Sequence, residues 1–171
     1  MGSERASANR STHFDEVVLP HLDAAYNLAL WLVRDRVLAQ DVVQDASVRA
    51  LGYFGSFRGG DGRAWLLRIV RRAAYDAMGA RAAARRLPRD GEAVVDPADD
   101  PEAALVQAQS RSILDRAIAR LPVELRECLV LRELEELSYK EIASITGAPV
   151  GTVMSRLWRA RQLLLQAGGG A

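Results

Sequence analysis

The sequence has little of the chemistry that metal sites and redox sites require. It contains one cysteine, Cys128, and two histidines, His13 and His21, which lie far from it in the chain. A single cysteine cannot form an intramolecular disulfide, and these three residues lack the spacing of a zinc site. Carboxylates are plentiful, but none is grouped with a nucleophile, metal ligands or a phosphate-binding glycine loop. We therefore expect no metal, no cofactor and no enzymatic activity.

Long apolar runs are also missing. No stretch approaches the roughly 18 apolar residues of a membrane span, and the N-terminal MGSERASANRST lacks the apolar core of a signal peptide. A content of 49% hydrophobic and 26% charged residues is typical of a folded chain. We expect a cytoplasmic protein without membrane contact of its own, disordered over residues 1–12 and in a flexible tail at 168–171.

Lysine is nearly absent, because Lys140 is the only one and arginine supplies almost all positive charge. Arginine suits bidentate contacts to phosphate and guanine, although a G+C-rich genome would produce the same bias. The net charge of +1 hides blocks of opposite sign. Residues 57–86 carry eight arginines against two aspartates, whereas residues 87–105 carry six acids against one arginine. The basic block is a candidate nucleic-acid surface.

Helical spacing of apolar residues predicts a bundle over residues 13–86. Residues 14–33 indicate one or two helices around Pro20, and residues 37–51 indicate another. The polar side of this second helix carries Asp41, Gln44 and Asp45. The glycine-rich stretch 52–62 contains three aromatic residues and predicts a loop with exposed rings.

A long helix is predicted over residues 63–86, with Asp61 as its cap. Its apolar residues fall on one arc of the helical wheel: Trp65, Leu66, Ile69, Val70, Ala73 and Ala77. Four residues lie on the opposite arc: Arg68, Arg71, Arg72 and Tyr75. A basic stripe with an aromatic residue in it fits a phosphate backbone or unstacked bases, although such a stripe is more often only a solvated surface.

Residues 87–101 contain three prolines and five acids and predict a flexible acidic linker. A second helical domain follows over residues 102–167, with helices expected at 102–120 and 122–135. Ser138 and Glu141 have the spacing of a capping box, which starts a helix that Gly147 stops. A further helix begins near Val150 and continues to about residue 166. This arrangement predicts a helix-turn-helix.

The last helix has the pattern of a recognition helix. Its predicted buried arc is Val150, Val153, Leu157, Ala160 and Leu164, and its outward face carries hydrogen-bond donors without any acid. An ordinary bundle helix with a charged surface is the alternative, but the capping box and the glycine-proline turn favour binding in the major groove.

These motifs resemble the extracytoplasmic-function (group 4) sigma factors of bacterial RNA polymerase, in the sigma-70 family. The similarity covers roughly residues 14–165. It rests on segments of the second domain such as Leu121-Pro122, Leu137-Ser138-Tyr139 and Pro149-Val150-Gly151-Thr152-Val153, which resemble region 4. In the first domain, Asp41, Val43-Gln44-Asp45 and Trp65-Leu66 resemble region 2. The resemblance implies an all-α protein with a region 2 bundle and a region 4 helix-turn-helix.

The resemblance also implies partners and roles for particular residues. Asp41, Gln44 and Asp45 would bind the clamp helices of the largest polymerase subunit, and region 4 would bind the flap of the second-largest. The minus-10 element would be bound by Phe57, Arg58, Arg63, Arg68, Arg71, Arg72 and Tyr75. The minus-35 element would be bound by Thr152, Met154, Ser155, Arg156, Trp158 and Arg159. An anti-sigma factor would hold the protein inactive.

Two positions depart from the family pattern. The family usually has asparagine at the position of Arg72, and this departure affects the details of minus-10 base recognition. It often has a basic residue at the position of Met154, so this chain lacks one minus-35 contact, which implies an altered promoter preference. The alternative function is a stand-alone helix-turn-helix regulator, whose first domain would be a helical sensor or dimerisation domain. Palindromic operator binding by a dimer without polymerase would distinguish it.

Overall fold

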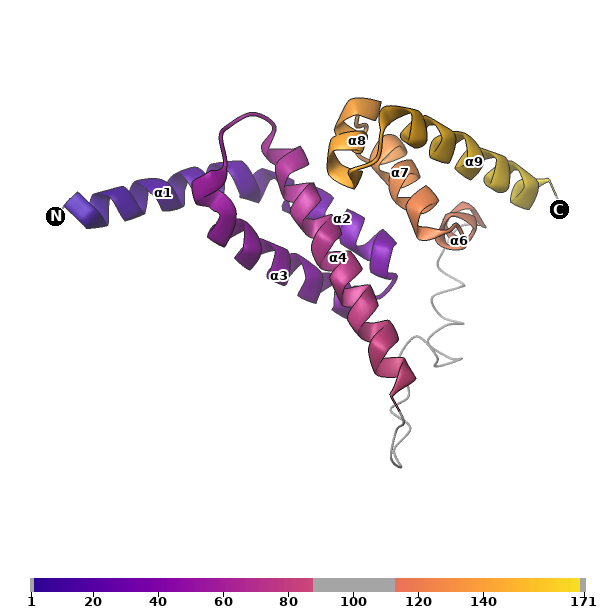
Figure 1. Cartoon of the computed structure of the whole chain (residues 1–171), viewed down its shortest axis with the longest axis horizontal. Helices are drawn as coiled ribbons and strands as arrows, with labels where there is room; N and C mark the ends of the chain where they lie inside the picture. The colour runs from indigo at the N-terminus through magenta and orange to yellow at the C-terminus, as the bar shows by residue number, and fades with distance from the viewer. Residues whose placement is uncertain (1, 88–112, 170–171) are drawn as a thin grey trace.

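The computed structural model describes residues 2–87 and 113–169, and only the backbone of residues 2–8. The described elements are all helices, which confirms the predicted all-α class. They form two groups, here called the N-terminal domain (residues 2–87) and the C-terminal domain (residues 113–169), as Figure 1 shows. The predicted acidic linker lies outside the described residues apart from Leu87. No helix within the described residues is both long and apolar enough to cross a bilayer.

The chain starts with helix α1 (Gly2–Val18), a short 3₁₀ helix η1 (Leu19–His21) and helix α2 (Leu22–Val33). Pro20 lies in η1, where its missing N–H separates the two α-helices. The structure differs from the disorder expected over residues 1–12, because helix α1 begins at Gly2. No proline or internal glycine interrupts this segment, and its alanine, glutamate and arginine residues favour helix.

Helix α3 (Arg36–Tyr53) is capped by Asp35, whose carboxylate accepts a hydrogen bond from the Leu38 amide at 2.9 Å. The 3₁₀ helix η2 (Phe54–Ser56) follows. Phe54 is only 7% exposed, so the expectation of a loop with exposed aromatic rings is wrong at this position. Burial of its ring against neighbouring aromatic side chains removes a large apolar surface from water.

Helix α4 (Gly62–Arg86) has Asp61 as its cap, as predicted, with the carboxylate 3.2 Å from the Ala64 amide. Its predicted arc is buried at Leu66, Val70 and Ala73, but Leu67 and Ala74 are also fully buried. The sequence did not predict that the side of α4 with Leu67 and Ala74 is buried as well. Both sides are buried because α4 packs against α2 and α3 and also against the C-terminal domain.

The C-terminal domain contains α6 (Ile113–Ala119), α7 (Val123–Glu133), α8 (Tyr139–Thr146) and α9 (Val150–Gly168). The Ser138–Glu141 capping box is confirmed, with both reciprocal hydrogen bonds present. Gly147 ends α8 with a positive φ of 71°, a conformation that costs glycine little. Val150 is 39% exposed rather than buried as predicted, because it lies in the first turn of α9.

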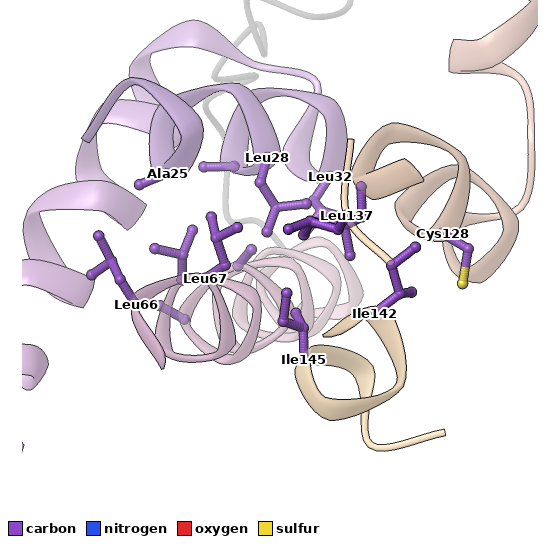
Figure 2. Close-up of a cluster of buried hydrophobic side chains, with 14 of the residues drawn as sticks. Ala25, Leu28, Leu32, Leu66, Leu67, Cys128, Leu137, Ile142 and Ile145 are labelled. Atoms are coloured by element: carbon purple, nitrogen blue, oxygen red, sulfur yellow. The ribbon is translucent and has the colours of Figure 1, made fainter. Parts of the chain in front are cut away.

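The two domains share one apolar core. Leu28, Leu32, Leu66 and Leu67 of the N-terminal domain belong to the same buried cluster as Leu137, Ile142 and Ile145 of the C-terminal domain. Figure 2 shows this cluster, with Leu32 beside Leu137 and Leu66 at the end away from the C-terminal domain. All seven side chains are at most 2% exposed. Because each buried aliphatic side chain of this size contributes roughly 1.5–3 kcal/mol, the contact between the domains stabilises their relative position.

Candidate nucleic-acid interface

Helix α9 presents the outward face that the sequence predicts. Trp158 is 66% exposed and Met154, Ser155 and Arg159 are exposed as well. Thr152 and Arg156 are half-buried at the edges of this face. The Ser155 hydroxyl donates to the Gly151 carbonyl at 2.9 Å, which keeps it close to the helix. The face therefore combines hydroxyl and guanidinium donors with two exposed apolar side chains.

The neighbouring helices fix the orientation of this face. Val153, Leu157 and Ala160 are buried and attach α9 to the domain core. The Gly147 amide donates to the Ala143 carbonyl at 2.9 Å, which closes the last turn of α8 before the chain enters α9. The arrangement is a helix-turn-helix, in which the second helix is free on one side to enter a major groove.

The basic stripe of α4 is only partly open to solvent. Arg72 is exposed, but Arg71 forms a bidentate ion pair with Glu127 of α7, with N–O distances of 2.8 and 3.1 Å. Burial alone would lower the pKa of Arg71, but the hydrogen bond and charge of Glu127 raise it overall. The Arg71 guanidinium also lies 4.4 Å from the centroid of the Tyr75 ring.

Tyr75 of α4 lies beside the ion pair of Arg71 and Glu127. Its hydroxyl is buried and has no hydrogen-bond partner. Burial first, and then the negative charge of Glu127, raise the pKa of Tyr75 above its ordinary value. The phenol is therefore neutral, and a hydrogen-bonding group enclosed without a partner destabilises this arrangement.

Two more arginines of the predicted minus-10 set contact the C-terminal domain. The Arg68 guanidinium donates to the Ser144 carbonyl at 3.0 Å and also to the Ser144 hydroxyl. Arg63 donates to the Glu135 carbonyl at 3.2 Å. The structure thus brings Arg63, Arg68 and Arg71 together on one side of α4, against the other domain.

The loop before α4 holds Phe57 in an aromatic cluster. Its ring centroid lies 5.8 Å from that of Phe54, in a stacked geometry, and 5.0 Å from that of Trp65. Arg58 is exposed beside it. Phe57 is half-buried, so one side of its ring packs on protein while the side chain still reaches the surface.

The acidic side of α3 is exposed at Asp41, Gln44 and Asp45. Asp45 forms an ion pair with Arg49 at 2.8 Å, and Arg49 also pairs with Asp76 of α4 at 2.8 Å. Asp41 takes part in neither pair. This surface is therefore accessible, and part of its charge is already balanced by Arg49.

Sequence reasoning missed Arg126 and Glu127, which are 6% and 0% exposed. Arg126 donates to the carbonyls of Trp31 and Leu32 at 2.7 and 3.2 Å, at the end of α2. It also donates to the Leu121 carbonyl at 2.8 Å. The available signal was two adjacent charged residues among the apolar side chains of α7, where unpaired charges are costly.

The chain matches two known protein families over separate segments. Residues 17–93 match the family described as Sigma-70 region 2, and residues 111–164 match Sigma-70, region 4. The region 2 match identifies the N-terminal domain as part of a sigma factor, which decides against a sensor or dimerisation domain of a stand-alone regulator.

Individual proteins agree with these matches. The chain is 34% identical to the RNA polymerase sigma-H factor of Pseudomonas aeruginosa, over 96% of this chain and 90% of that protein. It is 37% identical to the ECF RNA polymerase sigma-E factor of Escherichia coli K12, over 72% of this chain and 70% of that protein. The sigma factor RpoE of Bartonella quintana, solved in complex with the anti-sigma factor NepR, superposes with a TM-score of 0.71 at 27% identity, covering 92% and 98% of the two chains.

Both families occur in the order expected for a sigma factor, with the helix-turn-helix in the second. Sigma factors recruit polymerase to promoters and carry out no covalent chemistry, in agreement with the prediction that this chain is not an enzyme. The chain belongs to the extracytoplasmic-function sigma factors of the sigma-70 family.

Proposed function

We propose that the chain directs the core polymerase to promoters by binding a minus-35 duplex with α9 and a melted minus-10 strand with α4 and the preceding loop. The observation that carries this proposal is the outward face of α9. The helix contains three arginines and no carboxylate, and its exposed side lies immediately after the turn of a helix-turn-helix. This is the charge and geometry that a major groove requires.

The proposed minus-35 residues would make different kinds of contact with the duplex. Arg159 can donate two hydrogen bonds to a guanine edge, and Arg156 can bind a phosphate. Met154 and Trp158 offer apolar contacts that suit a thymine methyl group or a sugar. The remaining members of the proposed minus-35 set are Thr152 and Ser155. Because Met154 brings no charge where the family often has one, we expect an altered preference at the base it faces.

The minus-10 residues would bind a single strand. Phe57 provides a ring on which an unstacked base can pack, and the arginines provide phosphate contacts. The proposed set is Phe57, Arg58, Arg63, Arg68, Arg71, Arg72 and Tyr75. Flipping a base costs a few kcal/mol, so the free chain should bind promoter DNA weakly and depend on the phosphate contacts of the whole holoenzyme.

We also propose two protein partners. The α3 surface formed by Asp41, Gln44 and Asp45 would bind the clamp helices of the largest polymerase subunit, and the C-terminal domain would bind the flap of the second-largest. The structure of the Bartonella quintana relative is a complex with an anti-sigma factor, and a partner of that class would hold this chain inactive. Work on promoter DNA would place the chain in the cytoplasm.

Binding to core polymerase tests the α3 surface. Asp41→Arg is the cleaner substitution, because Asp45 already pairs with Arg49. It reverses one exposed charge on the proposed interface and should lower the affinity for purified core polymerase at least about tenfold, since like-charge contacts at an interface cost several kcal/mol. Co-elution in gel filtration and a fluorescence titration would measure this change.

Asp23→Arg is the matched control, because Asp23 is an exposed acid at the start of α2. It should leave the affinity for core polymerase unchanged. Equal affinities of the Asp41→Arg variant and the unaltered chain would remove the α3 surface from the polymerase interface.

A further inference from the structure

Helix α1 lies against the loop of residues 57–61, which joins η2 to α4. The ring centroids of His13 and Phe14 in α1 are 5.5 and 5.2 Å from that of Phe54, and the Phe54 ring in turn stacks on Phe57. Figure 1 shows α1 extending from the N-terminal domain on the side away from the C-terminal domain. The aromatic cluster therefore joins α1 to the residue proposed to hold an unstacked base.

The backbone of α1 also fits closely against the end of this loop. Gly62 is the first residue of α4, and a β-carbon on it would lie 2.8 Å from Val17 Cγ1 and 3.2 Å from the Val17 carbonyl oxygen. A larger residue would have to displace one of the two segments, because such distances are shorter than van der Waals contact. The close approach and the aromatic cluster together fix the loop against α1.

A groove runs between α1 and the loop. Its first part has a volume of about 320 Å³, within the range of roughly 300–1,000 Å³ of small-ligand sites, and is lined by Arg10, His13, Phe54, Gly55, Phe57 and Gly59. Its second part has a volume of about 510 Å³ and is lined by Asn9, Arg10, Thr12, His13, Glu16 and Phe54. Because the two parts share three residues, the groove leads from Phe57 along α1.

The groove has the groups that a nucleotide requires. Rings of His13 and Phe57 can border a base, and the exposed guanidinium of Arg10 can donate to a phosphate. The six residues of the first part include no acid. Glu16 lines only the second part, where its carboxylate lies 3.7 Å from His13 Nδ1. The part next to Phe57 is therefore the part suited to a phosphate.

The apolar core does not account for the α1 residues of this groove. Residues 9–13 are all exposed, whereas the α1 side chains packed on the core are Phe14, Val17 and Val18. Arg10 and His13 also lie before residue 17, where the match to Sigma-70 region 2 begins. Neither the packing nor the family match gives these two residues a role.

We infer that Arg10 and His13 of α1 form a second nucleotide subsite beside Phe57. In this subsite Arg10 binds a phosphate of the melted strand, and His13 borders the base of the nucleotide adjacent to the one that Phe57 holds. The inference rests on the proposed function, because it needs Phe57 to hold an unpaired base. Helix α1 thus extends the single-stranded footprint by one nucleotide.

The test measures how the assembled holoenzyme binds a fluorescent single-stranded oligonucleotide. Its sequence would be a minus-10 strand selected from a random pool with the unaltered holoenzyme. Arg10→Ala should lower the affinity about fivefold, because a charge-assisted hydrogen bond to phosphate is lost. Alanine favours helix at least as well as arginine, so the substitution leaves α1 intact.

Neutral phosphates locate the contact. The titration is repeated with oligonucleotides in which one phosphate at a time is replaced by an uncharged methylphosphonate. The loss caused by Arg10→Ala should vanish when the neutral group stands next to the base held by Phe57, and it should persist at the other positions. A loss of equal size at every position would overturn the subsite, because Arg10 would then act only by general attraction.

Arg36→Ala is the matched control. Arg36 is exposed at the start of α3, at the end of that helix far from the loop. The control changes the net charge equally and should leave the affinity for every oligonucleotide unchanged. Equal losses with Arg10→Ala and Arg36→Ala would count against the subsite.

Substitution of His13 tests the base contact. His13→Ala should also weaken binding, whereas His13→Phe keeps a ring beside Phe54 and should retain most of the affinity. Losses of equal size with both variants would contradict a ring contact to the base.

Phe57→Ala separates this inference from the proposed function. If Phe57→Ala weakens binding and Arg10→Ala does not, the minus-10 surface stands and the α1 subsite is overturned. If neither substitution changes the affinity, the assignment of the minus-10 surface itself fails, and the subsite fails with it.

Discussion

Arg159 is the residue from which promoter preference can be measured most directly. It is exposed on the outward face of α9, among side chains that carry no negative charge. If it donates to a guanine edge, Arg159→Ala should cost about 1–3 kcal/mol of minus-35 binding and relax the base preference at one position. Selection from a randomised minus-35 library with the holoenzyme would measure both effects.

Arg161→Ala is the control for this substitution. Arg161 lies on the same helix, but its guanidinium pairs with Glu133 of α7 at 2.9 Å. It should leave the selected sequence unchanged. A selected sequence that is the same for Arg159→Ala and for the unaltered chain would reduce Arg159 to a phosphate contact.

Cys128 should be chemically inert in the folded chain, as expected for a small core residue. It is buried, and burial together with the charge of Glu127 raises the pKa of the thiol to about 11. The thiolate is the reactive form, so labelling by a disulfide reagent at pH 8 should be at least about tenfold slower in the native chain than in urea. Rapid labelling of the native chain would contradict this prediction.

The same pKa has a consequence for stability. The folded chain holds the thiol proton more tightly than the unfolded chain, whose thiol has the ordinary pKa of 9.0. The contribution to stability is therefore fully present below pH 9 and is lost as the pH rises toward 11. Urea denaturation of the unaltered chain and Cys128→Ala across this range would show a smaller pH dependence for the variant.

At the scale of the helix, α8 depends on its ends. It is short, and its first turn is stabilised by the hydrogen bonds between Ser138 and Glu141. Ser138→Ala should lower the free energy of unfolding by about 1 kcal/mol, because an amide of the first turn loses its acceptor. Ser138→Asp should retain most of the stability, since aspartate also caps helices well. Urea denaturation midpoints would measure both values.

Helix ends were also the features that the sequence predicted best. Asp61, Ser138 and Gly147 act through residues at most four positions away, so their effects could be read from the chain alone. The outward face of α9 was predicted for the same reason, because helical periodicity is local. Helix α1 was missed at its start, where few apolar residues mark the pattern.

At the scale of the whole molecule, contacts between segments that are distant in sequence decide which side chains remain free to bind a partner. Arg71 and Glu127 are 56 positions apart, and Arg126 and Trp31 are 95 apart. No local pattern predicts that these pairs meet, so the sequence indicated neither the ion pair of Arg71 with Glu127 nor the contacts of Arg126 with α2. The second buried side of α4, at Leu67 and Ala74, was missed for the same physical reason.

The long-range contacts also affect how the chain would bind promoter DNA. The proposed minus-10 and minus-35 surfaces lie on different domains, and the described contact between the domains covers part of one of them. We expect core polymerase to set the distance between the two DNA elements. A chain without polymerase should therefore recognise promoters poorly.

The most direct measurement is transcription in vitro from a genomic promoter library. Purified chain would be added to core polymerase that lacks any other sigma factor, and the starts of the RNA would be sequenced. The account predicts new starts that share two upstream elements at one fixed separation, and it predicts that Asp41→Arg reduces them. Absence of new starts from a preparation in which the chain binds core polymerase would contradict promoter selection by this chain.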